Sequence, residues 1–337
     1  MVLSALGLGV AAGTSYLFSA NHDIPSADPA AEQRFRDAQD AMLARYDVPA
    51  TSLFHDIDDP RLRVHFIEAG RGAPVLLIHG GNSVAATWIP LLAKLHQRFQ
   101  LYAPDRPGCG LTTMFSYLGV PLRAHAIAFI NSVMGSLHLP QAALIGNSMG
   151  GYFCLVYALA HPERVSRLVL VGEPAGSAPD IPLANRLIGT RIVNSALFAS
   201  VLKPGPRVMR SSFENLLVAN VSRVPLADID CLALASMIPG ASESWITLME
   251  DIFEPPGAGL FSPVSTLTYA LRPELGGLKP PTLILWGEKD TFAPASVGQQ
   301  MARLMPKGQC HVIPDAGHLA WFDQTDACAD QMMAFLT

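Results

Sequence analysis

Charged residues are scarce in this chain. They make up 15% of the 337 residues, whereas hydrophobic residues make up 50%. A chain so poor in charge and so rich in apolar side chains is not intrinsically disordered or extended by charge repulsion. The 23 Lys and Arg residues are outnumbered by 28 Asp and Glu residues, which gives a net charge of −5. Because no basic stripe is available to neutralise a phosphate backbone, we expect no nucleic-acid partner.

Cysteine is also sparse, and the common metal and nucleotide motifs are missing. The five cysteines are scattered, odd in number and never in a C-x-x-C pair, which excludes a disulfide framework and a thiolate zinc site. The sequence has no H-E-x-x-H motif, EF-hand loop or P-loop, and no G-x-G-x-x-G follows the first predicted strand. We therefore expect no metal ion and no nucleotide or flavin cofactor.

One stretch without any charge lies near the start of the chain. Residues 2–20 are long enough for a membrane span or for the hydrophobic part of a signal sequence. No Lys or Arg precedes the stretch, and Gly7, Gly9 and Gly13 disfavour an isolated helix. Two interpretations stay open: a membrane anchor or export signal, or an apolar arm that packs on its own domain or on a second copy in a homodimer. The compartment, cytoplasmic or membrane-anchored or exported, stays open with them.

An amphipathic helix is predicted after this stretch. Between Glu32 and Tyr46, large apolar residues recur near helical spacing among charged residues, which predicts a helix on the surface of the domain. We assign residues 1–55 to an N-terminal appendage made of the apolar arm or anchor and this helix.

From Arg61 onward, short apolar runs alternate with segments of helix length. The predicted strands are 62–68, 74–79, 99–104, 142–146, 166–171, 281–286 and 310–314. Most are continuous apolar runs without polar alternation, as expected of parallel strands that are covered on both faces. The pattern predicts an α/β protein with a mostly parallel, doubly wound sheet.

A long interval interrupts this alternation. Between Glu173 and Lys279 no strand is predicted, and Met and Leu mix with Pro and Gly, which is typical of short helices joined by rigid turns. An insertion at this point lies at the carboxyl end of the sheet, where open α/β folds bind ligands. We expect a helical cap at 175–278, inserted after the sixth strand, between two parts of a core at 56–174 and 279–337.

The sequence Gly146-Asn147-Ser148-Met149-Gly150 lies between a predicted strand and a helix-like run. In a G-x-S-x-G turn the serine has strained backbone geometry, and a Cβ on either flanking glycine would collide with neighbouring backbone. The turn lifts the Ser148 hydroxyl clear of the sheet. It also points the amide of Met149 and the helix N-terminus at an anion that forms above the serine. The alternative is a glycine-rich helix start without chemistry.

A serine hydroxyl becomes a good nucleophile when a histidine removes its proton and a carboxylate orients that histidine. In this fold class the acid and then the histidine follow the serine along the chain. Asp290 closes the turn after the strand 281–286, and His318 lies in the loop after the last strand. Both residues are therefore expected at the same edge of the sheet as Ser148.

Other carboxylates compete with Asp290 for the role of the acid. Glu173 ends the strand before the interval, where some proteins of this architecture carry the acid. Glu288, Asp315 and Asp323 lie near in sequence, but we expect them to be solvated turn or helix-start residues. Asp290 is favoured because it closes a strand-end turn and a new helix begins after it.

An H-G-G-N sequence at 79–82 follows the strand 74–79. Its two glycines allow the backbone to approach a reacting carbonyl closely, so the amide of Gly81 can form an oxyanion hole with that of Met149. A turn that caps the next helix is the structural alternative, and both interpretations are compatible. We expect His79 to support the loop rather than to carry protons.

These motifs resemble those of the α/β-hydrolase superfamily. The resemblance runs from about Leu62 to the C-terminus through HGGNSVAATW, DRPGCG, GNSMGG, WGEKD and AGH, in the family's order. It implies an α/β-hydrolase fold with a cap at 175–278. The positions that fall on the family's catalytic triad and oxyanion hole are Ser148, Asp290, His318, Gly81 and Met149.

The serine in the turn favours acyl chemistry, because the haloalkane dehalogenases and epoxide hydrolases of this superfamily use aspartate there. The resemblance implies a capped serine esterase or lipase that cleaves small to medium hydrophobic esters through an acyl-enzyme on Ser148. The alternative is a meta-cleavage product hydrolase, which cleaves carbon–carbon bonds. Those enzymes usually have a Ser-Gly pair before the Trp, whereas the approach to Trp88 reads SVAAT here. A receptor-like relative that binds a ligand without turnover is a third interpretation.

Large apolar residues of the expected cap are candidates for the substrate pocket. They are Met237, Trp245, Met249 and Phe253. Ordinary helix packing is the alternative role for such residues. An apolar lining predicts medium-sized hydrophobic substrates with short to medium acyl chains.

Overall fold

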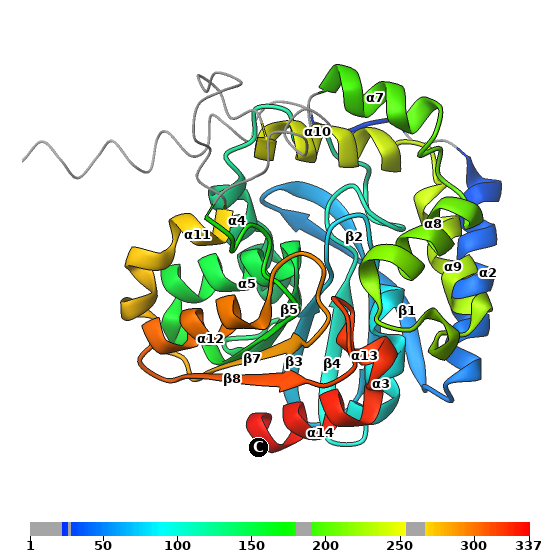
Figure 1. The fold of residues 1–337 in the computed structure, drawn as a ribbon. Coiled ribbons are helices and arrows are strands. Elements are labelled where there is room, and N and C mark those ends of the chain that lie inside the picture. Colours follow the sequence, from blue (N-terminus) through cyan, green and yellow to red (C-terminus); the bar gives the residue numbers. More distant parts are fainter. Residues whose placement is uncertain (1–21, 26–27, 180–190, 254–266) are drawn as a thin grey trace, which may run out of the picture.

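The computed structural model describes residues 22–25, 28–179, 191–253 and 267–337, and one sheet runs through them (Figure 1). The sheet has eight strands in the order β1-β2-β4-β3-β5-β6-β7-β8. The strands are β1 (Ala50–Asp58), β2 (Arg61–Gly70), β3 (Ala73–Ile78), β4 (Phe99–Pro104), β5 (Ala142–Asn147), β6 (Val165–Val171), β7 (Thr282–Gly287) and β8 (Gly308–Ile313). Strand β2 is antiparallel to both of its neighbours, and the pairs from β4 to β8 are parallel. The predicted α/β class with a mostly parallel sheet is confirmed.

Helices cover both faces of this sheet. The α-helices are α2 (Pro29–Arg45), α3 (Ile89–Leu95), α4 (Leu122–Ser136), α5 (Met149–Ala160), α7 (Arg191–Ala199), α8 (Pro206–Ser212), α9 (Leu226–Ser236), α10 (Ala241–Phe253), α11 (Leu267–Ala270), α12 (Ala295–Leu304), α13 (Ala320–Asp323) and α14 (Thr325–Leu336). In β3, Val75 and Leu77 join the core that includes α3 and α14, whereas Leu76 and Ile78 join the core that includes α4, α5 and α12. Because successive side chains of a strand point to opposite faces, a strand buried in this way must be apolar throughout.

Strand β1 begins inside the segment 1–55 that the sequence assigns to the N-terminal appendage and ends at Asp58, so the sheet starts before the predicted core. β1 pairs with β2 along its whole length, from Ala50 opposite Ala69 to Asp58 opposite Arg61. It is an edge strand, and most of its side chains are exposed or half-buried. An edge strand with polar side chains lacks the continuous apolar run by which the other strands are found.

A chain of hydrogen bonds connects β1 to the interior of the sheet. The exposed Ser52 lies 2.7 Å from Nε2 of the buried His65, whose Nδ1 lies 2.8 Å from Oδ2 of Asp105. Asp105 also accepts hydrogen bonds from the amides of Ala85 and Leu111. Buried carboxylates are stable when they are paired in this way. The turn after β4 thus has a structural role.

The predicted amphipathic helix is α2, and it packs on α9. Its Phe35 and Met42 are fully buried. At the end of the helix, Arg45 and the hydroxyl of Tyr46 both donate to the carboxylate of Asp228 on α9, the second at 2.7 Å. The N-terminal helix therefore lies against the helices inserted between β6 and β7.

The insertion after the sixth strand is helical, as predicted. In its described residues, α7 to α11 and the short turns between them follow β6 and precede β7. The residue limits of the cap and of the two core parts stay a prediction. The uncharged stretch 2–20 lies outside the described residues. Among the helices that the structure describes, none is both long and apolar enough to span a bilayer.

His125 of α4 is buried among aromatic rings. Its ring centroid lies 4.9 Å from that of Phe115, 5.3 Å from that of Tyr117 and 6.1 Å from that of Phe153. Burial, with the nearby charges of Arg106 and His22, lowers the pKa of His125 to about 3. The folded protein thus holds this imidazole neutral.

We expect this histidine to make the protein acid-sensitive. Since the unfolded chain binds the proton below about pH 6.5 and the folded chain only below pH 3, the free energy of unfolding falls as the pH drops from 7. By pH 5 the loss from this one group is about 2 kcal/mol. In denaturant titrations at pH 7 and pH 5, His125→Phe should lose about 2 kcal/mol less than wild type over this interval. Equal losses would contradict this account.

Candidate active site

Ser148 occupies a strained turn between β5 and α5. Its φ of 51° and ψ of −116° lie in a region that non-glycine residues rarely adopt. The neighbouring glycines make the turn possible. A Cβ on Gly146 would lie 2.5 Å from the carbonyl oxygen of Gly150, and a Cβ on Gly150 would lie 2.0 Å from that of Ile78. Both glycines are required by close backbone contact, as the sequence predicts.

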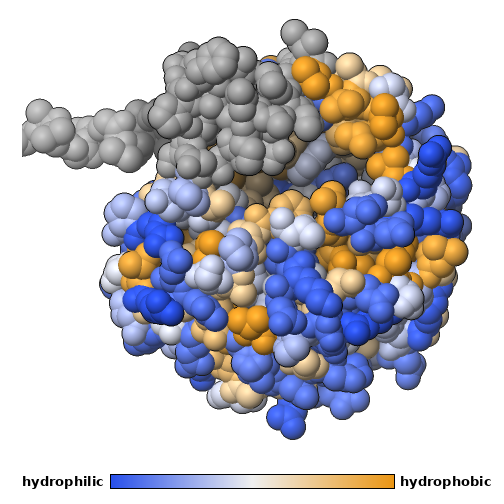
Figure 2. Space-filling model, viewed as in Figure 1, coloured by the Kyte–Doolittle hydropathy of each residue, from blue (hydrophilic) through white to orange (hydrophobic). Residues whose placement is uncertain are grey.

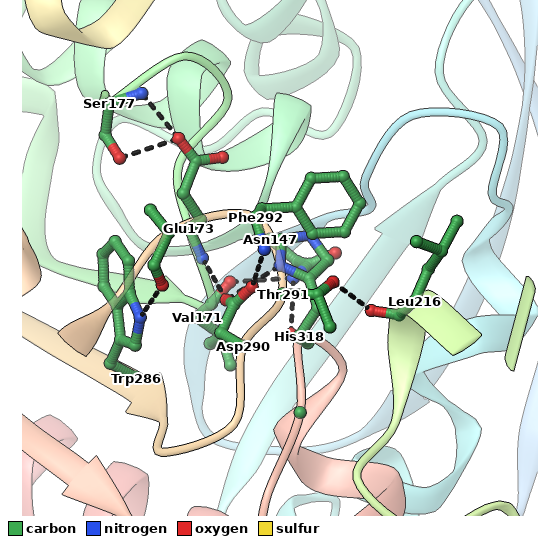
Figure 3. Close-up of polar contacts among 12 residues, drawn as sticks. Asn147, Val171, Glu173, Ser177, Leu216, Trp286, Asp290, Thr291, Phe292 and His318 are labelled. Atoms are coloured by element: carbon green, nitrogen blue, oxygen red, sulfur yellow. Dashed lines mark hydrogen bonds and ion pairs between the residues drawn. The ribbon is translucent and has the colours of Figure 1, made fainter. Parts of the chain in front are cut away.

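Asp290 and His318 meet after β7 and β8, at the carboxyl edge of the sheet. Nδ1 of His318 lies 2.9 Å from Oδ2 of Asp290, and both side chains are almost completely buried. The same oxygen accepts the amide of Glu173 at 2.9 Å, and the other carboxylate oxygen accepts the amide of Phe292 at 3.0 Å. Figure 3 shows Asp290 between these donors. The carboxylate thus holds a proton on Nδ1 of His318, which leaves Nε2 to accept a proton.

Glu173, the rival acid, has a different position. Its carboxylate accepts hydrogen bonds from the amide and the hydroxyl of Ser177, at 2.5 and 2.7 Å, and burial raises its pKa. In Figure 3 its side chain points away from His318, while its amide donates to Asp290. The structure therefore pairs His318 with Asp290 and uses the backbone of Glu173 to support that pair.

Two substitutions separate the two acids. Asp290→Asn removes the charge that orients His318, so we expect kcat to fall about 10⁴-fold. Glu173→Gln keeps the supporting amide and should retain turnover of the same order as wild type. Steady-state hydrolysis of a p-nitrophenyl ester measures both. Loss of turnover in Glu173→Gln with retention in Asp290→Asn would reverse the assignment.

The glycine loop after β3 lies directly against the serine turn. A Cβ on Gly80 would lie 3.2 Å from Cβ of Ser148, and a Cβ on Gly81 would lie 2.6 Å from the indole of Trp245 on α10. A side chain at Gly80 would press on Asn147 and Ser148, and one at Gly81 would press on the cap tryptophan. The loop thus lies next to Ser148, and the oxyanion hole of Gly81 and Met149 is predicted at this position.

Arg106 forms three hydrogen bonds with this loop. Its Nε and Nη2 donate to the carbonyls of His79 and Gly80, at 3.1 and 2.9 Å, and its amide donates to Nε2 of His79 at 2.8 Å. Burial and the Arg106 charge lower the pKa of His79 to about 3, so this imidazole is neutral. Its Nδ1 donates to the carbonyl of Gly80 at 2.9 Å. His79 therefore supports the loop and does not carry protons.

We expect Arg106→Lys to loosen the loop without removing the buried charge. Lysine has one donor nitrogen in place of the planar fork. Because small displacements of donors around a reacting group cost about 10 to 100-fold in rate, kcat should fall by that factor with little change in KM. The control is Arg123→Lys, which changes an exposed fork on Glu274. An unchanged kcat in Arg106→Lys would mean that the fork is only structural.

A cavity of about 410 Å³ opens above these residues. Ser148, His318, Gly80 and Gly81 form its floor, and apolar side chains of the cap form much of its wall. Those apolar side chains are Phe198, Leu202, Val208, Met209, Leu232, Trp245, Leu248 and Met249. Ser148 and His318, which the sequence predicts as partners, thus line the same largely apolar cavity.

Comparison with known families identifies the family of this fold. A family model described as the alpha/beta hydrolase fold matches residues 73–325, about three quarters of the chain. The chain belongs to the α/β-hydrolase family.

Two curated relatives and one solved structure are similar to this α/β-hydrolase. It is 26% identical to a 2-hydroxy-6-oxo-6-phenylhexa-2,4-dienoate hydrolase of Burkholderia cepacia, over 85% of this chain and 96% of the relative. It is 27% identical to a 2-hydroxy-6-oxononadienedioate/2-hydroxy-6-oxononatrienedioate hydrolase of Comamonas testosteroni, with the same coverage. A solved carboxylesterase of Bacillus subtilis matches with a TM-score of 0.70 at 23% identity, over 91% of this chain and 98% of that one.

Two of the four predicted pocket residues line the cavity of this hydrolase. Trp245 and Met249 do so from α10. Met237 does not, because it lies at the end of α9 with 44% of its surface exposed. The side chain of Phe253 is outside the described residues.

The loops that carry Asp290 and His318 are bonded to the cap along residues 216–220. The hydroxyl of Thr291 donates to the carbonyl of Leu216 at 2.8 Å, and the amide of Leu319 donates to the carbonyl of Leu217 at 2.8 Å. We call these contacts, with those of Asp323 below, the cap seam. They join the histidine loop and the acid loop to the same short cap segment.

Asp323 completes the cap seam and corrects a prediction. Its carboxylate accepts the amides of Gly317, Ala219 and Asn220, at 2.8, 2.8 and 3.0 Å, and the residue is 7% exposed. From the sequence we expect a solvated residue at this position. Charge and position near a helix start do not reveal that the cap folds back onto this side chain. Glu288 and Asp315, by contrast, are exposed as expected.

Proposed function

We propose that this hydrolase cleaves carboxylic esters of small to medium hydrophobic substrates through an acyl-enzyme on Ser148. The observation that supports the proposal is that Ser148 and His318 line one largely apolar cavity, with Nδ1 of His318 bonded to Asp290. A buried carboxylate in that position keeps the imidazole in the tautomer that accepts a serine proton.

The proposed reaction has two halves. Oγ of Ser148 attacks the ester carbonyl while Nε2 of His318 takes its proton, and the amides of Gly81 and Met149 stabilise the oxyanion. His318 then gives the proton to the leaving alkoxide, which departs as the alcohol. In the second half, His318 takes a proton from water, the hydroxide attacks the acyl group, and the carboxylic acid leaves as Ser148 regains its proton.

The charge of the lining favours esters over dicarboxylate substrates. The relative from Comamonas testosteroni acts on a dienedioate, which carries two carboxylates. Among the described residues that line the cavity, Arg106 is the one with a permanent positive charge, and its Nε and Nη2 are bonded to the glycine loop. A dianion buried in this cavity would lack a second cation, which is strongly unfavourable.

A carbon–carbon bond hydrolase is the second candidate. The relative from Burkholderia cepacia acts on a phenyl dienoate, which carries one carboxylate and an apolar ring. Nη1 of Arg106 is buried and has no hydrogen-bond partner in the described part of the chain. It could receive a single carboxylate, and the apolar wall would suit the phenyl group.

A substrate panel separates the two candidates. We expect wild type to hydrolyse p-nitrophenyl butyrate and octanoate with a kcat/KM that exceeds its value for 2-hydroxy-6-oxo-6-phenylhexa-2,4-dienoate by at least about tenfold. Ser148→Ala should lower ester turnover by about 10⁶-fold and abolish labelling by a fluorophosphonate. Ser236→Ala, which changes another serine of the cavity lining, should keep both.

Each remaining result has a defined meaning. Faster cleavage of the dienoate would replace the ester proposal with the second candidate. Ester turnover that survives Ser148→Ala would remove the acyl-enzyme mechanism. If wild type turned over neither compound but bound them, the protein would be a ligand-binding relative.

A further inference from the structure

One segment of the cap is basic although the whole chain is acidic. Between Asp180 and Glu214 the sequence contains Arg and Lys residues but no Asp or Glu. They are Arg186, Arg191, Lys203, Arg207 and Arg210. In the described part of this segment, Lys203 and Arg207 are exposed, and Arg210 is paired with Asp230 at 2.9 Å. This one segment of the cap therefore presents positive charge at Lys203 and Arg207, on a molecule with a net charge of −5.

The same segment exposes large apolar side chains beside the cavity. Val193 on α7 is 39% exposed, and Val201, just after α7, is 72% exposed. Leu216 and Phe292 are 48% and 50% exposed and also line the cavity, so they lie at its mouth. Figure 2 shows apolar residues gathered where Figure 1 places α7, next to a hollow in the surface. Phe198, Leu202 and Val208 of the same segment line this cavity together with Leu216 and Phe292. Exposed apolar groups gathered around a cavity mark interaction surfaces.

The uncharged stretch 2–20 joins the described structure near the same side. The residues that follow it pair with the segment 114–116, since the amide of Ile24 donates to the carbonyl of Met114 at 2.9 Å. That segment is in turn bonded to α10, where Ser244 accepts the amide of Phe115 at 3.2 Å. α10 packs on α7. The described residues 22–25, which follow the uncharged stretch, are thus connected through the segment 114–116 and α10 to α7.

We propose that the α7 face is a docking surface for an anionic lipid bilayer. We define the α7 face as Val193, Val201, Lys203 and Arg207, with Leu216 and Phe292 at the cavity mouth. An apolar patch with basic residues at its border fits the boundary between headgroups and acyl chains, and the negative surface potential adds attraction for each Lys or Arg. Docked in this way, the cavity opens toward the lipid. If the proposed ester hydrolysis holds, its substrates enter from the membrane.

Quenching of a new tryptophan by brominated lipid tests the contact in the full-length chain. Val201→Trp places the probe on the α7 face, and Leu304→Trp places it on α12, where the replaced side chain is 40% exposed. Trp88, Trp286 and Trp321 are fully buried, whereas Trp245 is half-buried and lines the cavity, so the emission of the unsubstituted chain with the same vesicles is subtracted from that of each variant. With vesicles of phosphatidylcholine and phosphatidylglycerol, bromination of the chains should lower the probe emission of Val201→Trp about twofold and leave that of Leu304→Trp unchanged.

Charge reversal tests the electrostatic part. Lys203→Glu with Arg207→Glu in the Val201→Trp background should abolish most of the quenching, as should vesicles of phosphatidylcholine alone. The matched control is Arg303→Glu with Lys307→Glu, which reverses two exposed charges near α12 and should have no effect.

The proposal fails if vesicles bind the protein without quenching the probe at residue 201, because the stretch 2–20 or another face then makes the contact. It also fails if quenching is equal with neutral vesicles. A lipid-independent blue shift that grows with protein concentration would identify a second copy of the chain as the occupant. None of these measurements needs turnover, so their outcome is independent of the ester panel.

Discussion

The site depends on one constraint, the close approach of three pieces of backbone around Ser148. The turn after β5, the first turn of α5 and the glycine loop after β3 are so near each other that Gly146 and Gly150 have no room for a Cβ. This crowding holds Ser148 at a positive φ that it would not adopt alone. Relaxation of the turn is prevented because the parallel pairing of β3 with β5 fixes the two loops relative to each other. The strain of one residue is thus maintained by the packing of a whole sheet.

Around that turn, most supporting groups act through backbone atoms. Glu173 contributes its amide to Asp290, and Arg106 binds the carbonyls of the glycine loop. Such contacts set the orientation of Asp290, His318 and Gly81 before any substrate arrives. Electrostatic preorganisation of this kind is a large part of the rate enhancement in many enzymes, because the donors need not rearrange during the reaction.

The parts of the molecule that the sequence predicts well are those in which local pattern and position coincide. Ser148 and Asp290 each follow an apolar strand that is buried on both faces and visible as a continuous run, and His318 lies in the loop after the last predicted strand. The edge strand β1 is missed because only one of its nine residues, Ile57, is buried. Asp323 is missed because its three partners come from a loop and from the cap, about a hundred residues earlier in the case of Ala219 and Asn220. Contacts of that kind leave no trace in spacing or composition.

The cap seam limits how this protein could be re-engineered. A helical insertion between two strands invites the construction of chimaeras, in which the lid of one relative is transplanted onto the scaffold of another. Here residues 216–220 form hydrogen bonds with Thr291, Leu319 and Asp323. A foreign lid that lacked a matching segment would leave the carboxylate of Asp323 without two of its hydrogen-bond donors. It would also remove the carbonyl that accepts the amide of Leu319 in the histidine loop. Transplants should therefore include the seam on both sides of the junction.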